Sequence, residues 1–272
     1  MDFAELGLSE KTIKAITDAG ISAPTTVQAD VIPSILAGKD VFAIAPARCG
    51  KTCSYVLPLI DIMSRHEAKN ILIITAGSKQ SVCVSDRFAV FNKYHEINES
   101  TVTDSQETIN EEANVIIASP NLLVDLMKEE KVDLSAIDIL VVDDINLIKK
   151  FHQLRSLQTV LETLPADKQN IVFTNRRSKE TQMILDQILQ APDEIKVDRG
   201  KEEEAVAAEE NAEENVQPKP TVPEKTSEKS DGKKTRENLH DFEAVSLMKR
   251  YRTFGRQTPE FMLTRVELAE EE

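Results

Sequence analysis

The sequence is short of positive charge and of cysteine. Its 33 Lys and Arg residues stand against 47 Asp and Glu residues, which gives a formal net charge of −14 at pH 7. Such a chain is not suited to hold a nucleic acid by bulk electrostatic attraction, because proteins that do so carry a basic surface. Its three cysteines form no CxxC pair and cannot build a disulfide framework. We therefore expect a reducing, cytoplasmic setting.

Long apolar runs are also missing. The sequence has no stretch of about 18 apolar residues, so we expect no membrane-spanning helix. Residues 1–5 contain no basic residue and do not lead into an apolar core, so they are not predicted to be a secretory signal.

Apolar residues are unevenly distributed, and their distribution divides the chain into three parts. Residues 199–238 contain no Leu, Ile, Met or aromatic residue and several glutamates and prolines. They can bury too little apolar surface to offset the entropy lost on ordering, which predicts a disordered acidic linker. Residues 1–198 are predicted to be a folded domain, and residues 239–272 a separate short segment.

The C-terminal segment, residues 239–272, carries an amphipathic pattern. Apolar side chains recur at every third position from Phe242 to Tyr251, beside several lysines and arginines, which predicts a short basic and aromatic helix. Two interpretations are open. The helix packs back on the folded domain, or it is a tethered peptide that folds on a protein partner.

Within residues 1–198, short β-branched runs alternate with helix-length segments. Unbroken runs of this kind are typical of strands buried on both faces. This alternation indicates βαβ units, and hence an α/β fold whose parallel sheet is covered by helices on both faces. The predicted strands are residues 41–45, 71–75, 115–118, 139–142, 171–174 and 195–197, and the predicted helices include residues 51–64, 78–92, 122–128 and 178–190.

Gly50, Lys51 and Thr52 lie where a predicted strand meets a predicted helix. At such a junction, backbone N–H groups and the N-terminus of the helix bind phosphates, the lysine reaches phosphate oxygens and the hydroxyl binds Mg²⁺. The sequence therefore predicts a phosphate-binding loop.

Two carboxylates, Asp143 and Asp144, follow another predicted strand. An aspartate at the end of such a strand can hold the Mg²⁺ of a phosphate loop, and a second acid can position or deprotonate a water. A helix N-cap is the alternative, because aspartate is common there.

Together with the N-terminal segment, these motifs resemble the first RecA-like domain of the DEAD-box RNA helicases over residues 3–198. Residues 20–28, G-I-S-A-P-T-T-V-Q, resemble the Q motif of that family. The resemblance implies a RecA-like P-loop fold that binds ATP with Mg²⁺. It also implies that Gln28 contacts the adenine edge, that Phe3 packs on the base, and that Pro24 and Thr25 belong to the nucleotide pocket.

The phosphate loop departs from the family pattern A-x-T-G-x-G-K-T. Residues 45–52 read A-P-A-R-C-G-K-T, so that Arg48 replaces a glycine. If Arg48 takes a positive φ, we expect a strain of about 1–2 kcal/mol. Its guanidinium can compensate by contacting a phosphate, which places Arg48 with Gly50, Lys51 and Thr52 among the expected nucleotide contacts.

The D-E-A-D box is also altered, since residues 143–146 read D-D-I-N. The resemblance implies that Asp143 and Thr52 bind the metal and that Asp144 is the catalytic acid, one methylene shorter than the usual glutamate. Asn146 replaces an acid that contacts the family's S-A-T motif, represented here by Thr174. This exchange predicts weakened coupling of ATP turnover to strand separation.

The motifs that contact RNA are the least similar. The pattern P-T-R-E-L-A becomes A-G-S-K-Q-S at residues 76–81, without its arginine, and T-P-G-R is reduced to Ser119, Pro120 and Asn121, followed by a leucine. Asn121 and the helix that follows could meet one phosphate of an RNA. A simple turn and helix start is the alternative that we favour, so RNA binding is expected to be weak.

Two functions remain open. One is an ATP-binding, single RecA-like domain with weak or no autonomous helicase activity, which acts in an RNA or ribonucleoprotein context. The other is an inactive pseudo-helicase scaffold that binds a protein partner. No segment after Gly200 resembles the H-R-x-G-R-x-x-R motif of a second RecA-like domain, so we expect that domain to be absent or supplied by another protein.

Overall fold

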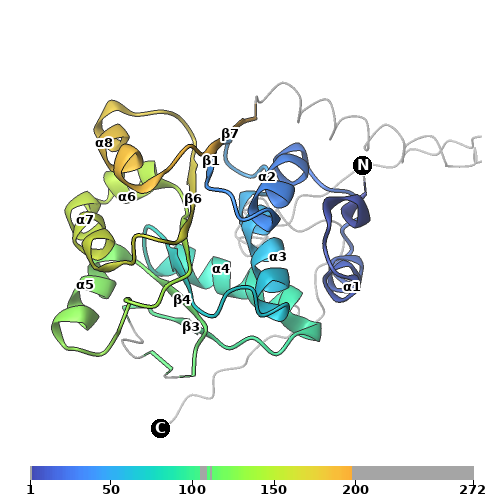
Figure 1. Cartoon of the computed structure of the whole chain (residues 1–272), viewed down its shortest axis with the longest axis horizontal. Helices are drawn as coiled ribbons and strands as arrows, with labels where there is room; N and C mark the ends of the chain where they lie inside the picture. The colour runs from blue at the N-terminus through green and yellow to red at the C-terminus, as the bar shows by residue number, and fades with distance from the viewer. Residues whose placement is uncertain (1, 105–108, 111, 198–272) are drawn as a thin grey trace, which may run out of the picture. The chain divides into compact units, whose positions relative to one another are not determined.

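The computed structural model describes residues 2–104, 109–110 and 112–197. The predicted linker (199–238) and C-terminal helix (239–272) lie outside the described residues. Within the described part, seven parallel strands form one sheet in the order β3-β4-β2-β5-β6-β1-β7 (Figure 1). The strands are β1 (Val41–Ile44), β2 (Ile71–Ile74), β3 (Glu99–Thr101), β4 (Val115–Ala118), β5 (Ile139–Val142), β6 (Gln169–Thr174) and β7 (Asp193–Lys196).

Helices precede or connect the strands and cover both faces of the sheet (Figure 1). The predicted α/β fold with a parallel sheet between two helical layers is therefore confirmed. The helices are η1 (Phe3–Leu6), α1 (Glu10–Asp18), α2 (Thr26–Leu36), α3 (Lys51–Ser64), α4 (Ser78–Phe91), η2 (Asn92–Tyr94), α5 (Pro120–Lys128), α6 (Ile145–Lys150), α7 (Leu154–Thr163) and α8 (Lys179–Ile188).

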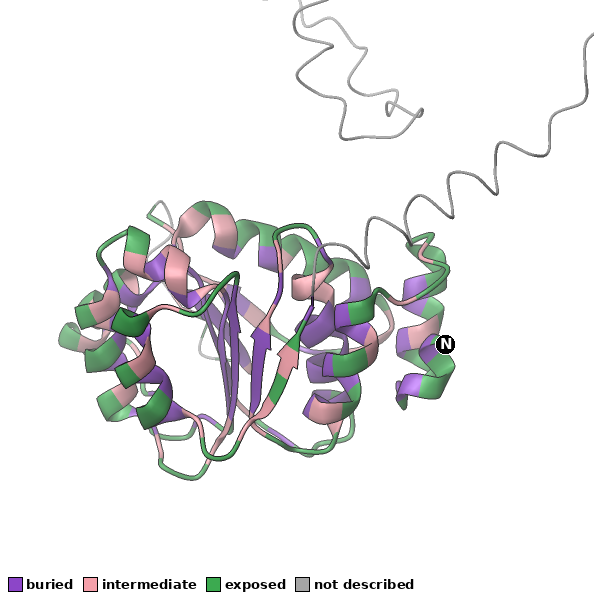
Figure 2. Ribbon diagram, turned by 90° about the horizontal axis from the view of Figure 1, so that it is seen from above, coloured by how far each residue is buried: buried purple, intermediate pink, exposed green. Residues whose placement is uncertain are grey.

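The strands divide the interior into two cores, because successive side chains of a strand point to opposite faces of the sheet. In β2, Ile71 and Ile73 pack with η1 and α1–α4, whereas Leu72 and Ile74 pack with α5–α8. Figure 2 shows the buried strands between helices whose outer surfaces are exposed. The β-branched runs are thus buried on both faces, as their composition predicts.

Several elements differ from the sequence prediction. The edge strand β3 was not predicted, because it is three residues long and polar at both ends, and it pairs with β4 alone. Helix α5 begins at Pro120 rather than at residue 122, since proline fits the first position of a helix. Strand β7 begins at Asp193 rather than at residue 195, where alternating charged residues hide it.

The register of the strands brings several loops to one edge of the sheet. Ile44 pairs with Thr174, so β1 ends level with β6, and Ile74 pairs with both Ala118 and Val142, so β2 ends level with β4 and β5. Val142 pairs with Val172, which places the two groups of strand ends within two residues of each other. Ligands of open parallel sheets bind outside this edge. The phosphate loop, Asp143 and the loops after β2, β4 and β6 therefore all start there.

A buried carboxylate fastens the N-terminal helices to the domain. Asp61 of α3 is fully buried and accepts hydrogen bonds from the Ser9 N–H (2.5 Å), the Ser9 hydroxyl (2.7 Å) and the Thr12 hydroxyl. Arg65 of the same helix pairs with it at 3.4 Å. Because Ser9 is the N-cap of α1, this cluster holds the first helix against α3.

In the described residues, no helix combines the length and apolar character needed to cross a bilayer.

Removal of the Asp61 carboxylate should destabilise the domain. Asp61→Ala leaves the Ser9 and Thr12 donors without their acceptor, so we expect the free energy of unfolding to fall by about 2–4 kcal/mol, as measured by urea denaturation. As a control, Asp125→Ala breaks an exposed pair with Lys128, which should cost less than about 0.5 kcal/mol. Equal losses in the two variants would contradict the assigned role of Asp61.

Candidate nucleotide-binding site

The loop between β1 and α3 closes on itself. Gly50 has a left-handed backbone (φ +85°), and α3 starts at the next residue. The Lys51 ammonium, at the end of the loop, donates to the carbonyl of Ala45 at the start of the loop, at 3.2 Å. The Cys49 thiol contacts the Pro46 carbonyl at 3.1 Å. The predicted phosphate loop therefore has the expected position, with its lysine held at the mouth of the loop.

Arg48 has the positive φ that we considered when its sequence was compared with the family pattern. Its φ is +68°, in the left-handed region where a side chain costs about 1–2 kcal/mol. The residue is exposed, so its guanidinium is free to meet an anion. Strain of this kind concentrates at functional sites.

The segment that resembles the Q motif contacts the phosphate loop directly. Thr25 and Gln28 form a capping box at the start of α2, in which the Thr25 N–H donates to Gln28 Oε1 at 3.0 Å. The Thr25 hydroxyl donates to the Cys49 carbonyl at 3.0 Å, and Gln28 Nε2 donates to the Gly50 carbonyl at 3.4 Å. The structure therefore brings together residues that the sequence assigned to one pocket.

Phe3 and Pro24, which were also predicted to belong to the nucleotide pocket, have other surroundings than Thr25 and Gln28. Phe3 is 2% exposed and belongs to the core below η1, so its ring offers little surface to a base in this structure. Pro24 is half-buried next to Thr25. Base contacts by Phe3 and Gln28 stay predictions.

The contact between the two segments leaves no room for a side chain at position 50 unless Gln28 or Thr25 moves. A Cβ atom at Gly50 would lie 2.6 Å from Gln28 Nε2 and 3.0 Å from Thr25 Oγ1. Gly38 also has a positive φ (+72°), but a Cβ atom there would meet nothing within 4 Å.

These two glycines separate backbone strain from steric conflict. We expect Gly38→Ala to lower the free energy of unfolding by about 1 kcal/mol, from the left-handed backbone alone. Gly50→Ala should cost clearly more, about 2–4 kcal/mol, because the methyl group also displaces Gln28 and Thr25. Chemical denaturation of both variants measures the difference, and indistinguishable losses would show that the contact at Gly50 is not tight.

Asp143 lies at the end of β5 and is almost fully buried, at 4% exposure. Its Oδ2 atom accepts hydrogen bonds from Gln80 Nε2 (2.8 Å) and from the Tyr55 hydroxyl (3.3 Å). Burial raises the pKa of the Asp143 carboxyl, and the Gln80 hydrogen bond and the Lys51 ammonium oppose this shift.

Tyr55 links Asp143 to the start of α3. Burial, followed by the nearby Asp143 carboxylate, raises the pKa of the Tyr55 hydroxyl well above its ordinary value, so this group stays protonated and able to donate. A hydrogen bond with Thr52 acts on the pKa of Tyr55 in the opposite direction. Thr52 and Asp143 therefore flank the same hydroxyl group.

The donor set at this place fits Mg²⁺. It offers the Asp143 carboxylate and the Thr52 hydroxyl, and Mg²⁺ is usually bound by one or two carboxylates together with waters and substrate phosphates. In the described residues no group of three or more His, Cys, Asp and Glu side chains could enclose a metal. A metal bound here would thus depend on phosphate oxygens as further ligands.

Asp144 caps the next helix. Its backbone is left-handed (φ +63°), and its carboxylate accepts a hydrogen bond from the Leu147 N–H at 3.2 Å at the start of α6. The alternative interpretation of this residue as an N-cap is therefore confirmed, and its catalytic role stays a prediction. Asp144 also lines an open hollow of about 370 Å³ with Asn146, Leu147, Lys149, Lys150, Asn175 and Arg176.

Asn146 contacts the loop after β6, as the resemblance implies. Its Nδ2 group donates to the Thr174 hydroxyl (2.7 Å), to Asn175 Oδ1 (3.1 Å) and to the Arg176 carbonyl (2.6 Å). An aspartate at this position could donate to none of them. The replacement by asparagine therefore keeps the connection and reverses its hydrogen-bond polarity.

Restoring the acid should weaken this connection. In Asn146→Asp, a carboxylate would face the oxygens of Asn175 and Arg176, so we expect the free energy of unfolding to fall by about 1–3 kcal/mol in urea denaturation. The control Asn121→Asp introduces the same change at an exposed helix N-terminus, where negative charge is tolerated or favourable. An unchanged stability of Asn146→Asp would show that the three contacts contribute nothing.

The predicted nucleic-acid contacts lie at the start of α5. Ser119 is the N-cap and Pro120 the first helical residue, so the turn and helix start that we favoured is confirmed. Asn121 is exposed, and its Oδ1 accepts from the Ser156 hydroxyl at 2.7 Å. Contact with an RNA phosphate stays a prediction. Ser119 and Asn121 line a hollow of about 770 Å³ together with Gly77, Lys79, Gln80, Phe151 and other residues.

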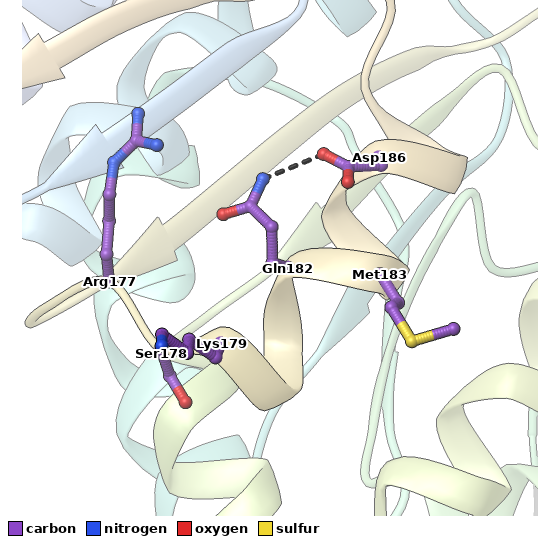
Figure 3. Close-up of a pocket in the computed structure, with 6 residues that line it drawn as sticks. All are labelled: Arg177, Ser178, Lys179, Gln182, Met183 and Asp186. Carbon is purple, nitrogen blue, oxygen red and sulfur yellow. Dashed lines mark hydrogen bonds between the residues drawn. The ribbon is translucent and has the colours of Figure 1, made fainter.

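A further hollow lies along α8. It encloses about 470 Å³ and is lined by Arg177, Ser178, Lys179, Gln182, Met183 and Asp186. Figure 3 shows the Gln182 side chain turned toward Asp186, to which it donates at 2.7 Å. None of the predicted nucleotide contacts belongs to this lining.

The sequence analysis did not identify Tyr55, Gln80 and Gln153. Tyr55 and Gln80 donate to the Asp143 carboxylate, and Gln153 donates to the carbonyl of Ala76. Gln80 carried a signal, since it stands where the pattern P-T-R-E-L-A has leucine. A polar residue in place of an apolar one at a helix start indicates a buried hydrogen-bond partner. Tyr55 and Gln153 carried no such signal, because only the packing of α3 and α7 defines their neighbours.

The parallel sheet between two helical layers, with a P-loop sequence between β1 and α3, defines a domain of the RecA-like fold. The sequence profile of the DEAD/DEAH box helicase family matches residues 25–184, which is more than half of the chain. The chain therefore belongs to the DEAD/DEAH box helicase family, and the resemblance stated above is confirmed.

Individual relatives are distant. The DEAD-box ATP-dependent RNA helicase RhpA of Helicobacter pylori is 27% identical over 201 residues, which cover 72% of this chain and 41% of RhpA. The chain thus spans about two fifths of the length of this curated relative.

Solved structures show the same fold. A DEAD box protein from Methanococcus jannaschii superposes with a TM-score of 0.69 at 21% identity, over 73% of this chain and 56% of that one. Dbp5 of Saccharomyces cerevisiae, bound to Gle1 and IP6, reaches 0.66 at 18% identity, over 73% of this chain and 52% of that one.

Proposed function

We propose that this domain binds ATP with Mg²⁺ between the start of α2, the phosphate loop and Asp143. The observation that carries the proposal is the contact at Gly50, where Thr25 and Gln28 hydrogen-bond the carbonyls of Cys49 and Gly50. This contact joins a segment suited to a base with a loop suited to phosphates. Both amide and hydroxyl groups there can donate and accept.

Each residue of the site has a defined task in this proposal. Lys51 exchanges the Ala45 carbonyl for a phosphate oxygen, and Arg48 adds a second cation at the same loop. Thr52 and Asp143 hold Mg²⁺, which neutralises charge on the phosphates when bound.

We further propose that ATP turnover and strand separation by this domain are weak or absent. Asp144 is engaged as a helix cap and is shorter than glutamate, and a shift of about 1 Å in a catalytic group can cost on the order of 100-fold in rate. Asn146 donates where the family pattern has an acid. The relative RhpA is named as an RNA helicase, which supports an RNA or ribonucleoprotein context for this domain.

Nucleotide binding is tested by thermal stability. A ligand at about 100 times its Kd raises stability by about 2.7 kcal/mol, so millimolar Mg-ATP should raise the melting temperature of the wild-type protein. Lys51→Ala should lose most of this rise, because the ammonium that meets the phosphates is gone. Lys39→Ala removes an exposed ammonium paired with Asp193 and should keep the rise.

The alternative is an inactive scaffold that binds a protein partner, in part through residues 239–272. It is favoured by the closed state of the site, in which Gln28 and Lys51 are both bonded to the protein itself. If Mg-ATP does not change the melting temperature of the wild-type protein, nucleotide binding is contradicted and this alternative is supported. The complex of the structural relative Dbp5 with Gle1 is an example of such an association in that protein.

A further inference from the structure

Two glutamines outside the predicted site form a hydrogen-bonded path to Asp143. Gln80 lies in the first turn of α4, and both ends of its amide are used. Its Oε1 accepts from the Ala76 N–H at 2.8 Å, while its Nε2 donates to Asp143 Oδ2 at 2.8 Å and to the Asp143 carbonyl at 3.3 Å. With both ends bonded, the side chain has one orientation in which all partners are satisfied.

Gln153 continues this path to the start of α5. It is 8% exposed, and its Nε2 donates to the Ala76 carbonyl at 3.0 Å. Its Oε1 accepts from the Asn121 N–H at 3.4 Å. Ala76 thus contacts one glutamine through its N–H and the other through its carbonyl, so the bonds run from Asn121 through Gln153, Ala76 and Gln80 to Asp143.

Gln80 is half-buried, and it stands where the related family pattern has an apolar leucine, which could make none of these hydrogen bonds. At Asp143, Tyr55 and Gln80 both donate to Oδ2. Among the described residues no side-chain donor is bonded to Oδ1, so one carboxylate oxygen is held while the other stays available.

We propose that Gln80 is a positioning residue that orients the Asp143 carboxylate for Mg²⁺, and that Gln153 connects it to the start of α5. This inference rests on the proposed binding of Mg²⁺ with a nucleotide. Groups that hydrogen-bond a metal ligand fix its orientation, and their loss typically lowers metal affinity by about 10–100-fold. Gln80 acts through Asp143 and contacts neither metal nor nucleotide.

The proposal is tested by the Mg²⁺ dependence of nucleotide binding to the full chain. Gln80→Met keeps the length of the side chain and removes both hydrogen-bonding groups. The dissociation constant of a fluorescent ADP analogue is measured with Mg²⁺ and with EDTA. In Gln80→Met the affinity with Mg²⁺ should fall by about 10-fold or more, whereas the affinity in EDTA should equal that of the wild type.

The matched control is Gln182→Met on α8. Gln182 is half-buried like Gln80 and also donates to an aspartate at 2.7 Å, but that aspartate, Asp186, is exposed and both residues line a different hollow. This variant should bind the analogue as the wild type does under both conditions. If Gln80→Met does not fold, Gln80→Leu, which has the residue of the family pattern, is measured in its place.

The path through Ala76 predicts that the two glutamines are coupled. Gln153→Met should lower the Mg²⁺-dependent affinity less than Gln80→Met, and the double variant should resemble Gln80→Met alone, since both act on Asp143 through one chain of bonds. In the free wild-type protein, the side-chain NH₂ signal of Gln80 in a ¹⁵N NMR spectrum should exchange slowly with water. It should move when Mg²⁺ is added to the ADP-bound protein.

Unchanged Mg²⁺-dependent affinity in Gln80→Met overturns the inference while the proposed function stands. Equal weakening with Mg²⁺ and with EDTA also overturns it, because it indicates a general loss of structure. If the wild-type protein binds the analogue under neither condition, the proposed function itself fails. Additive effects of the two substitutions would contradict the proposed connection to α5 through Gln153, but not the role of Gln80 at Asp143.

Discussion

The close contact between the start of α2 and the phosphate loop is the constraint on which the site depends. Any side chain at Gly50 would have to displace Gln28, since a Cβ atom there would lie 2.6 Å from Gln28 Nε2. Gly50 also supplies the left-handed turn that begins α3. One backbone position therefore sets both the direction in which α3 begins and the distance between the phosphate loop and the start of α2.

The parallel register of the sheet then brings the other groups to this place. Because β1, β2, β5 and β6 are parallel and end within two residues of one another, the residues that follow them converge at one edge. Asp143 is buried there and kept in place by Tyr55 and Gln80, which come from two different helices. A buried carboxylate needs such partners, as an unpaired one would be expensive to desolvate.

The altered positions fall into two kinds. Asn146 retains the contact to Thr174 with a changed donor, and Gln80 adds a contact that a leucine could not make. Arg48 introduces strain with a positive φ, without a side chain that packs inside the loop. The connections around the site are thus maintained or extended, whereas the loop that would meet the phosphates is the part that carries a local cost. This distribution is one reason why we propose that the domain binds ATP but turns it over weakly.

The sequence by itself determined the buried parallel strands, the phosphate loop and the family, because β-branched runs and the motifs around Gly50 and Asp143 are local patterns. It also indicated that Arg48 could need a positive φ. Only the tertiary structure decided that Asp144 caps a helix, that Phe3 is buried, that Gln80 bonds Asp143 directly, and that Gln153 is connected to Gln80 through Ala76. Those outcomes depend on packing between segments far apart in the chain, where no residue pattern records which side chains meet. The short strand β3 was hidden for the same reason, since its pairing with β4 and not its composition makes it a strand.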